Sequence, residues 1–121
     1  MGRIGTVEHQ GKRILLMDFS GLRPGEEFER SIAEAKAYIA SQPAKSVRSV
    51  FDATGAVYNA AALGVLKDFT KHNEPYMKAS ALVGITGLLN VALVAVSKFS
   101  GRTFHTFPDR PSAMDWLVEQ P

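Results

Sequence analysis

Short apolar runs separated by polar breaks recur along the chain at lengths typical of β-strands. Gln10-Gly11 separates the first two runs, and glycine there can supply the positive φ that a tight hairpin turn requires. The second run, RILLMDF, is apolar over most of its length, as in a strand covered on both faces. We therefore predict five strands, the first two paired as a hairpin: Ile4–His9, Lys12–Phe19, Val47–Asp52, Lys78–Ile85 and Thr103–Phe107.

Between these runs, apolar residues recur three or four positions apart, which is the spacing of one helix face. The stripe of Phe28, Ile32, Ala35 and Ile39 predicts a first helix that begins near Pro24. Further helices are predicted from Asn59 to His72, from Leu88 to Phe99, and from Pro108-Asp109-Arg110-Pro111 onward. The order predicts a single α/β domain over residues 1–121: an N-terminal hairpin, then alternating helices and strands, with a mostly parallel or mixed central sheet and four helices.

One stretch, Ala79–Ser97, has no charged side chain and is nearly long enough to span a bilayer. Gly84, Gly87, Thr86 and Asn90 interrupt it. We interpret it as a buried strand followed by an apolar helix, because that combination produces the same hydropathy as a membrane span.

The composition is that of an ordinary globular domain, with 121 residues, 45% hydrophobic residues and 21% charged residues. A net charge of +2 is too small to indicate a nucleic-acid partner. The absence of cysteine excludes disulfides and thiolate nucleophiles, and the N-terminus has no apolar signal segment. We predict a cytoplasmic location.

The loops that follow the strands are the expected functional region, because ligands and partners of such sheets meet the carboxyl ends of the strands. These loops are Ser20-Gly21, Asp52–Asn59 and Gly84–Gly87, and we expect them on one edge. The candidate binding residues are Asp52, Thr54, Gly55, Tyr58 and Asn59. Tyr58 could either hydrogen-bond a ligand or pack over the start of the helix.

No residue pattern assigns a reaction. An aspartic-protease motif is broken by Ala53, and no nucleophile-elbow pattern places a serine. His9, His72 and His105 do not have the spacing of metal ligands. We therefore predict no catalytic residue, no metal and no cofactor, and a protein that is not an enzyme.

The order of elements resembles that of the STAS domains, named for sulfate transporters and anti-sigma factor antagonists, and especially a diverged branch grouped with CRAL-TRIO lipid-binding proteins. In anti-sigma factor antagonists a strand ends in a pattern like D-L-S-G, which Asp52-Ala53-Thr54-Gly55 resembles. A few residues later D-S-S-G opens a helix with a phosphorylatable serine. Leu63-Gly64-Val65-Leu66 resembles the apolar run after that motif.

Asn59-Ala60-Ala61-Ala62 stands where that family has Asp-Ser-Ser-Gly. Alanine has no hydroxyl to carry a phosphoryl group, so the usual phosphoserine switch is not expected. The resemblance implies a regulatory protein–protein interaction module. Its partner would be a regulatory kinase or an anti-sigma factor.

The apolar helix predicted over Leu88–Phe99 favours an alternative, because a helix that is apolar nearly all round is either deeply buried or used for contact. It could form a small apolar-ligand or lipid site, a membrane-surface contact, or a homodimer interface. The candidate residues of this alternative are Thr86, Leu88, Leu89 and Leu93.

Overall fold

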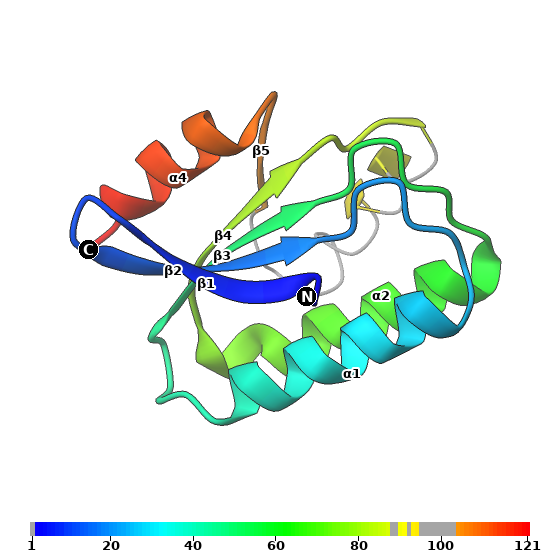
Figure 1. Cartoon of the computed structure of the whole chain (residues 1–121), viewed down its shortest axis with the longest axis horizontal. Coiled ribbons are helices and arrows are strands. Elements are labelled where there is room, and N and C mark those ends of the chain that lie inside the picture. The colour runs from blue at the N-terminus through cyan, green and yellow to red at the C-terminus, as the bar shows by residue number, and fades with distance from the viewer. Residues whose placement is uncertain (1, 88–89, 92, 95–103) are drawn as a thin grey trace.

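The computed structural model describes residues 2–87, 90–91, 93–94 and 104–121 of the chain. Helices and strands alternate after an N-terminal hairpin (Figure 1). In chain order the described elements are β1 (Ile4–His9), β2 (Lys12–Asp18), α1 (Glu26–Ala40), β3 (Val47–Asp52), α2 (Ala60–Asn73), the 3-10 helix η1 (Glu74–Tyr76), β4 (Met77–Val83), β5 (His105–Phe107) and α4 (Arg110–Val118).

The strands form one mixed sheet in the order β1-β2-β3-β4-β5. Only the β1–β2 pair is antiparallel, and each of the other described pairs is parallel. Gln10 and Gly11 form the two-residue hairpin turn with φ angles of 50° and 82°, as the sequence predicts. The predicted α/β architecture with a mixed sheet is therefore confirmed.

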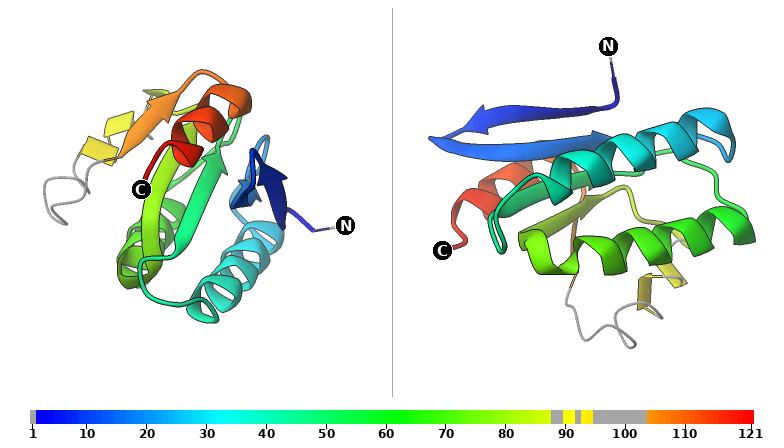
Figure 2. Two further views of the ribbon diagram at one scale, coloured as in Figure 1. Left: turned by 90° about the vertical axis from the view of Figure 1, so that its left-hand side faces the viewer. Right: turned by 90° about the horizontal axis from the view of Figure 1, so that it is seen from below.

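Helices cover both faces of the sheet, α1 and α2 on one side and α4 on the other (Figure 2). Side chains alternate along β3: Phe51 packs in the core on the α1 and α2 side, whereas Val50 packs with Ala113 and Leu117 of α4. The parallel strands lie between two helical layers, which explains why RILLMDF is apolar on both faces.

The apolar stripe predicted for the first helix is buried in α1, where Phe28, Ile32, Ala35 and Ile39 are at most 4% exposed. Glu26, Glu27 and Glu29 lie in the first turn, where the helix dipole favours negative charge. In α2, Asn59 is the N-cap, and its side-chain oxygen accepts a hydrogen bond from the backbone N–H of Ala62 at 2.8 Å.

The expected count of four helices is not matched, because the described residues form three α-helices. The helix expected over Leu88–Phe99 lies mainly outside the described residues. Strand β4 ends at Val83, two residues earlier than predicted, because Gly84 turns the chain with a φ of 75°. Among the helices built from described residues, none is long and apolar enough to cross a membrane.

Candidate functional site

The ends of three parallel strands meet at one edge of the sheet, which we call the carboxyl edge. The backbone N–H of Phe19 donates to the carbonyl of Asp52 at 2.9 Å, and that of Ala53 donates to Val83 at 2.8 Å. The N–H of Gly21 donates to the carbonyl of Thr54 at 2.8 Å. The loops after β2, β3 and β4 are thus adjacent, as the sequence analysis expects.

Two of these loops have the same four-residue pattern and the same hydrogen bonds. They are Asp18-Phe19-Ser20-Gly21 and Asp52-Ala53-Thr54-Gly55. In each, one aspartate oxygen accepts hydrogen bonds from the backbone N–H and the hydroxyl two residues later. The glycines have φ angles of 66° and 69°. The sequence placed Ser20-Gly21 at this edge too, but candidate binding residues were predicted only in the second turn, although the repetition of Asp-x-Ser/Thr-Gly after two strands was a readable signal.

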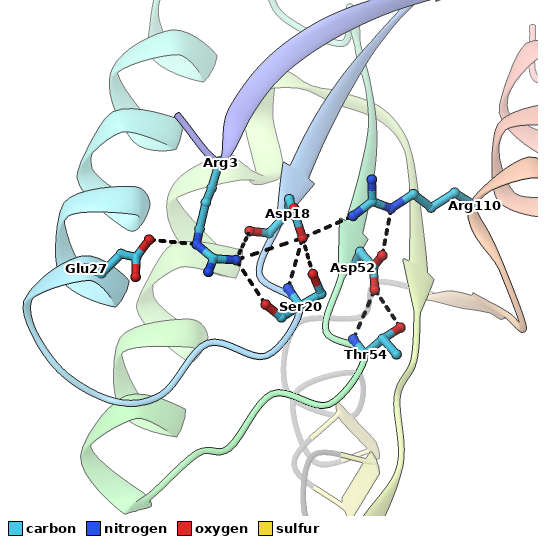
Figure 3. Close-up of polar contacts among 7 residues, drawn as sticks. All are labelled: Arg3, Asp18, Ser20, Glu27, Asp52, Thr54 and Arg110. Carbon is cyan, nitrogen blue, oxygen red and sulfur yellow. Dashed lines mark hydrogen bonds and ion pairs between the residues drawn. The ribbon is translucent and has the colours of Figure 1, made fainter. Parts of the chain in front are cut away.

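Arg110, at the start of α4, bridges the two aspartates (Figure 3). Its Nη2 lies 3.0 Å from Oδ1 of Asp18, and its Nε donates to Oδ2 of Asp52 at 2.6 Å. Burial alone would raise the pKa of Asp52, but the hydrogen bonds from Thr54 and Arg110 outweigh it and hold that pKa below its ordinary value of 3.8. Asp52 is therefore ionised in the folded protein at neutral pH.

Arg3 extends these contacts to β1 and α1 (Figure 3). Its guanidinium donates to the carbonyls of Asp18 and Ser20 at 3.1 and 2.9 Å, and to Oε2 of Glu27 at 2.8 Å. The residues joined in this way form what we call the aspartate–arginine network: Arg3, Asp18, Ser20, Glu27, Asp52, Thr54 and Arg110. Each of its five charged groups makes at least one ion pair with another member.

Gly84 brings the end of β4 directly against the second turn. A Cβ at this position would lie 2.6 Å from both the backbone N and the Cα of Thr54, and φ is 75°. Only glycine permits both the close approach and this backbone conformation. The end of β4 is thus packed closely against the backbone of Thr54, whereas Thr54 and Gly55 remain exposed on the other side.

Tyr58 and Asn59 serve local structure in the described part of the chain. The ring of Tyr58 packs edge-on against Phe28, with centroids 5.9 Å apart, and Asn59 caps α2. The Tyr58 hydroxyl is buried without a hydrogen-bond partner among the described residues, and burial raises the pKa of this phenol. The ring of Tyr58 thus packs against α1, and hydrogen bonding of its hydroxyl to a ligand stays a prediction.

Exposed small residues flank Tyr58 and Asn59 in the sequence, at the end of the loop and at the start of α2. Val57 is 48% exposed, and the exposed residues Ala60, Ala61 and Gly64 follow in the first turns of α2. Residues 60, 61 and 64 share one helix face because they are three and four positions apart. We call these four residues the helix-start surface. The sequence-based interaction edge, Asp52 to Leu63, includes Val57, Ala60 and Ala61, but none of the four was a candidate binding residue, because small residues carry no chemical signature.

The second group of candidate residues is only partly described. Thr86 is exposed, and Leu93 lies on the wall of a cavity of about 100 Å³ between α2 and strands β3 and β4. Leu88 and Leu89 lie outside the described residues.

Within the part of the chain that the structure describes, no three histidine, aspartate or glutamate side chains are grouped as a metal site.

Comparison with known proteins identifies a fold. No protein-family model matches the chain, and no curated protein matches it. Among solved structures it is similar to an uncharacterised protein of the DUF3478 family from Shewanella loihica PV-4, described as having a SpoIIAA-like fold. The TM-score is 0.72 at 21% sequence identity, covering 94% of this chain and 91% of that one. The chain therefore has a SpoIIAA-like fold, which is the STAS-like fold that the resemblance in the sequence implies.

Proposed function

We propose that this chain is a non-enzymatic protein–protein interaction module of STAS type, and that it docks a regulatory partner through the helix-start surface. The observation that carries the proposal is the exposure of Val57, Ala60, Ala61 and Gly64 on a loop and helix start that the fold holds in place. A kinase or an anti-sigma factor is the class of partner that the STAS resemblance suggests.

The backbone of this surface is anchored before any partner binds. The N–H of Val57 donates to the carbonyl of Leu22 at 2.9 Å, and that of Ala56 donates to Ala53 at 3.0 Å. Asn59 fixes the start of α2. Association with a preorganised surface loses less conformational entropy than association with a flexible loop.

The side chains also suit docking. Valine, alanine and glycine have few or no rotamers to lose, so their burial in an interface costs little side-chain entropy. Small residues on an exposed helix face allow a partner to approach the α2 backbone closely. Both properties favour contact with another protein over recognition of a small polar substrate.

The chemistry of the neighbouring network supports a role without catalysis. The carboxylates of Asp18, Glu27 and Asp52 are each paired with arginine. The hydroxyls of Ser20 and Thr54 donate to the aspartates of their own turns. These carboxylates and hydroxyls are engaged in contacts that hold the loops together. A catalytic acid or base would instead need to exchange protons with a substrate.

The usual STAS phosphorylation switch does not fit this surface. Ala60 and Ala61 occupy the positions where the family has serine, and neither carries an oxygen. We propose that partner release is controlled by something other than phosphorylation at these two positions.

Site-specific photo-cross-linking in cells tests the proposal. A photoreactive residue at Ala61 should give a discrete adduct with a partner, whereas the same residue at Ala37, an exposed position on α1, should give none. With the partner identified and purified, Ala61→Arg should weaken its affinity at least tenfold and Ala37→Arg should leave it unchanged. An adduct only with a second copy of the chain, or equal affinities for both variants, would contradict the proposal.

A further inference from the structure

The cavity lies beneath α2, which among the described helices covers the sheet less completely than α1 does. Helix α1 buries an apolar stripe along its length, whereas α2 buries only Ala62, Phe69 and Asn73. Leu63 and Leu66 also face the sheet but remain partly exposed, and both line the cavity of about 100 Å³.

Two small polar residues lie in the floor of the cavity, whose lining is otherwise mostly apolar. Ser49 of β3 and Ser80 of β4 are register partners, and both line the cavity. The next lining residues along these strands are Phe51 and Leu82, which are also paired. Serine is smaller than the leucine or valine expected at such positions, so it fills less of the space under α2; Ser80 is partly exposed there, whereas Ser49 is buried.

The two ends of the cavity differ in polarity. Strands β3 and β4 run in parallel from their serines toward Phe51 and Leu82 at the carboxyl edge. Helix α2 runs in the opposite direction (Figure 1), so Thr70 lies toward the serine end and Leu63 toward the apolar end. A molecule that fills this space therefore meets the serine hydroxyls among apolar side chains such as Phe69 and Met77 at one end, and hydrocarbon at the other.

The hydroxyl of Ser49 is poorly satisfied. Ser49 is 2% exposed, and its hydroxyl donates to Sδ of Met77 at 3.7 Å, a weak acceptor. It makes no other hydrogen bond within the described ranges. Buried polar groups in native proteins nearly always have a good partner, and the weak Ser49–Met77 contact leaves this hydroxyl available to a stronger acceptor in the cavity that both residues line.

We propose that this cavity binds a small neutral amphipathic molecule, with an aliphatic or aromatic body against Leu63, Leu66 and Leu82 and a hydroxyl or carbonyl oxygen that hydrogen-bonds Ser49. The cavity of about 100 Å³ is smaller than the apolar cavity of about 150 Å³ that accommodates benzene, so a ring-sized ligand would be buried only in part. The ligand is neutral because Lys67, the charged residue of the described lining, is exposed, and a buried carboxylate would lose its hydration without a buried cation.

Phenol and benzene are matched probes, since they differ by the hydroxyl alone. Titration of each into the nitrogen-15-labelled full chain should give saturable amide shifts in β3, β4 and α2 for phenol, with benzene bound at least tenfold more weakly. Ser49→Ala should remove the preference for phenol. Leu66→Trp, which fills the cavity, should abolish binding of both, and Val7→Trp on the exposed face of β1 should not.

Shifts that stay linear with both probes in the unsubstituted chain would overturn the proposal, as would equal affinity for benzene and phenol. Binding that survives Leu66→Trp would place the ligand elsewhere and would also overturn it. Should Leu66→Trp fail to fold, Ser80→Leu fills the same cavity from the sheet and replaces it in the comparison.

Discussion

Asp18 and Asp52 each close a turn and each bind Arg110, so two residues 34 positions apart in the sequence perform the same task in the fold. Each aspartate satisfies backbone and hydroxyl donors of its own loop, and each then binds the guanidinium of α4. Hydrogen bonds to a charged group are stronger than neutral ones, so these contacts fix the loop conformations firmly. The loop Gly55–Asn59 follows directly on the hydrogen-bonded turn of Asp52.

Gly84 is the residue at which a single methyl group should be most damaging. Gly84→Ala places a Cβ against the backbone of Thr54 and forces alanine into a φ of 75°. We expect a loss of about 2–4 kcal/mol in the free energy of unfolding, measured by urea denaturation. Gly64→Ala is the matched control, because nothing lies within 4 Å of its added Cβ and alanine favours helix. That variant should gain up to about 1 kcal/mol; similar losses in both variants would show that close packing at Gly84 is not the cause.

At the scale of elements, α4 is attached to the sheet in two ways. Ala113 and Leu117 pack against the sheet through buried apolar contact, and Arg110 reaches across the ends of β2 and β3. Asp109 caps the helix by accepting a hydrogen bond from the N–H of Ser112 at 2.9 Å. The cap and the arginine are adjacent in sequence, so the start of α4 determines where the guanidinium lies.

The ion pairs of Arg110 should contribute measurably to the docking of α4. Arg110→Ala leaves Asp52, whose side chain is 8% exposed, without its cation. We expect a loss of about 1–3 kcal/mol in the free energy of unfolding, because a buried charge left unpaired loses its hydration without compensation. A double-mutant cycle with Asp52→Asn isolates the pair: the loss on Arg110→Ala should shrink in the Asp52→Asn background. An undiminished loss would show that Arg110 acts through other contacts.

At the scale of the whole molecule, the two faces of the sheet differ in how completely helices cover them. The α4 face is closed by close-packed residues such as Val50, Ala81 and Leu117, none of them measurably exposed. The opposite face is closed under α1 and open under α2, where the cavity lies. The helix-start surface and the cavity share α2. The two proposals are nevertheless independent, since one concerns exposed residues of its first turns and the other its sheet-facing side.

The stability of the whole chain should depend on pH through the paired aspartates. The hydrogen bonds and ion pairs of Asp18 and Asp52 outweigh burial and lower both pKa values from 3.8. A depressed pKa in the folded state gives stability that is present above pH 3.8 and is lost as pH falls below it, because the unfolded chain takes up protons first. The free energy of unfolding should therefore fall steeply below about pH 4. Denaturant titrations from pH 7 to pH 3 should show a shallower fall for Arg110→Ala than for the unsubstituted chain; equal slopes would contradict the assignment.

Local patterns were sufficient for most of the architecture. The hairpin at Gln10-Gly11, the buried stripe of α1 and the cap at Asn59 each depend on residues within a few positions of one another, so the sequence alone determined them. The apolar runs also determined that the parallel strands lie between helices. The candidate turn Asp52–Gly55 was found in the same way.

Only the tertiary structure decided which contacts and which spaces form between these elements. Arg3 and Arg110 reach Asp18 across 15 and 92 positions of sequence, and no local pattern records such a pairing. The cavity depends on how α2 lies over Ser49 and Ser80, which is a matter of packing between elements rather than of periodicity within one. Local residues specify which element forms, whereas the space and charge between elements exist only after the chain has folded.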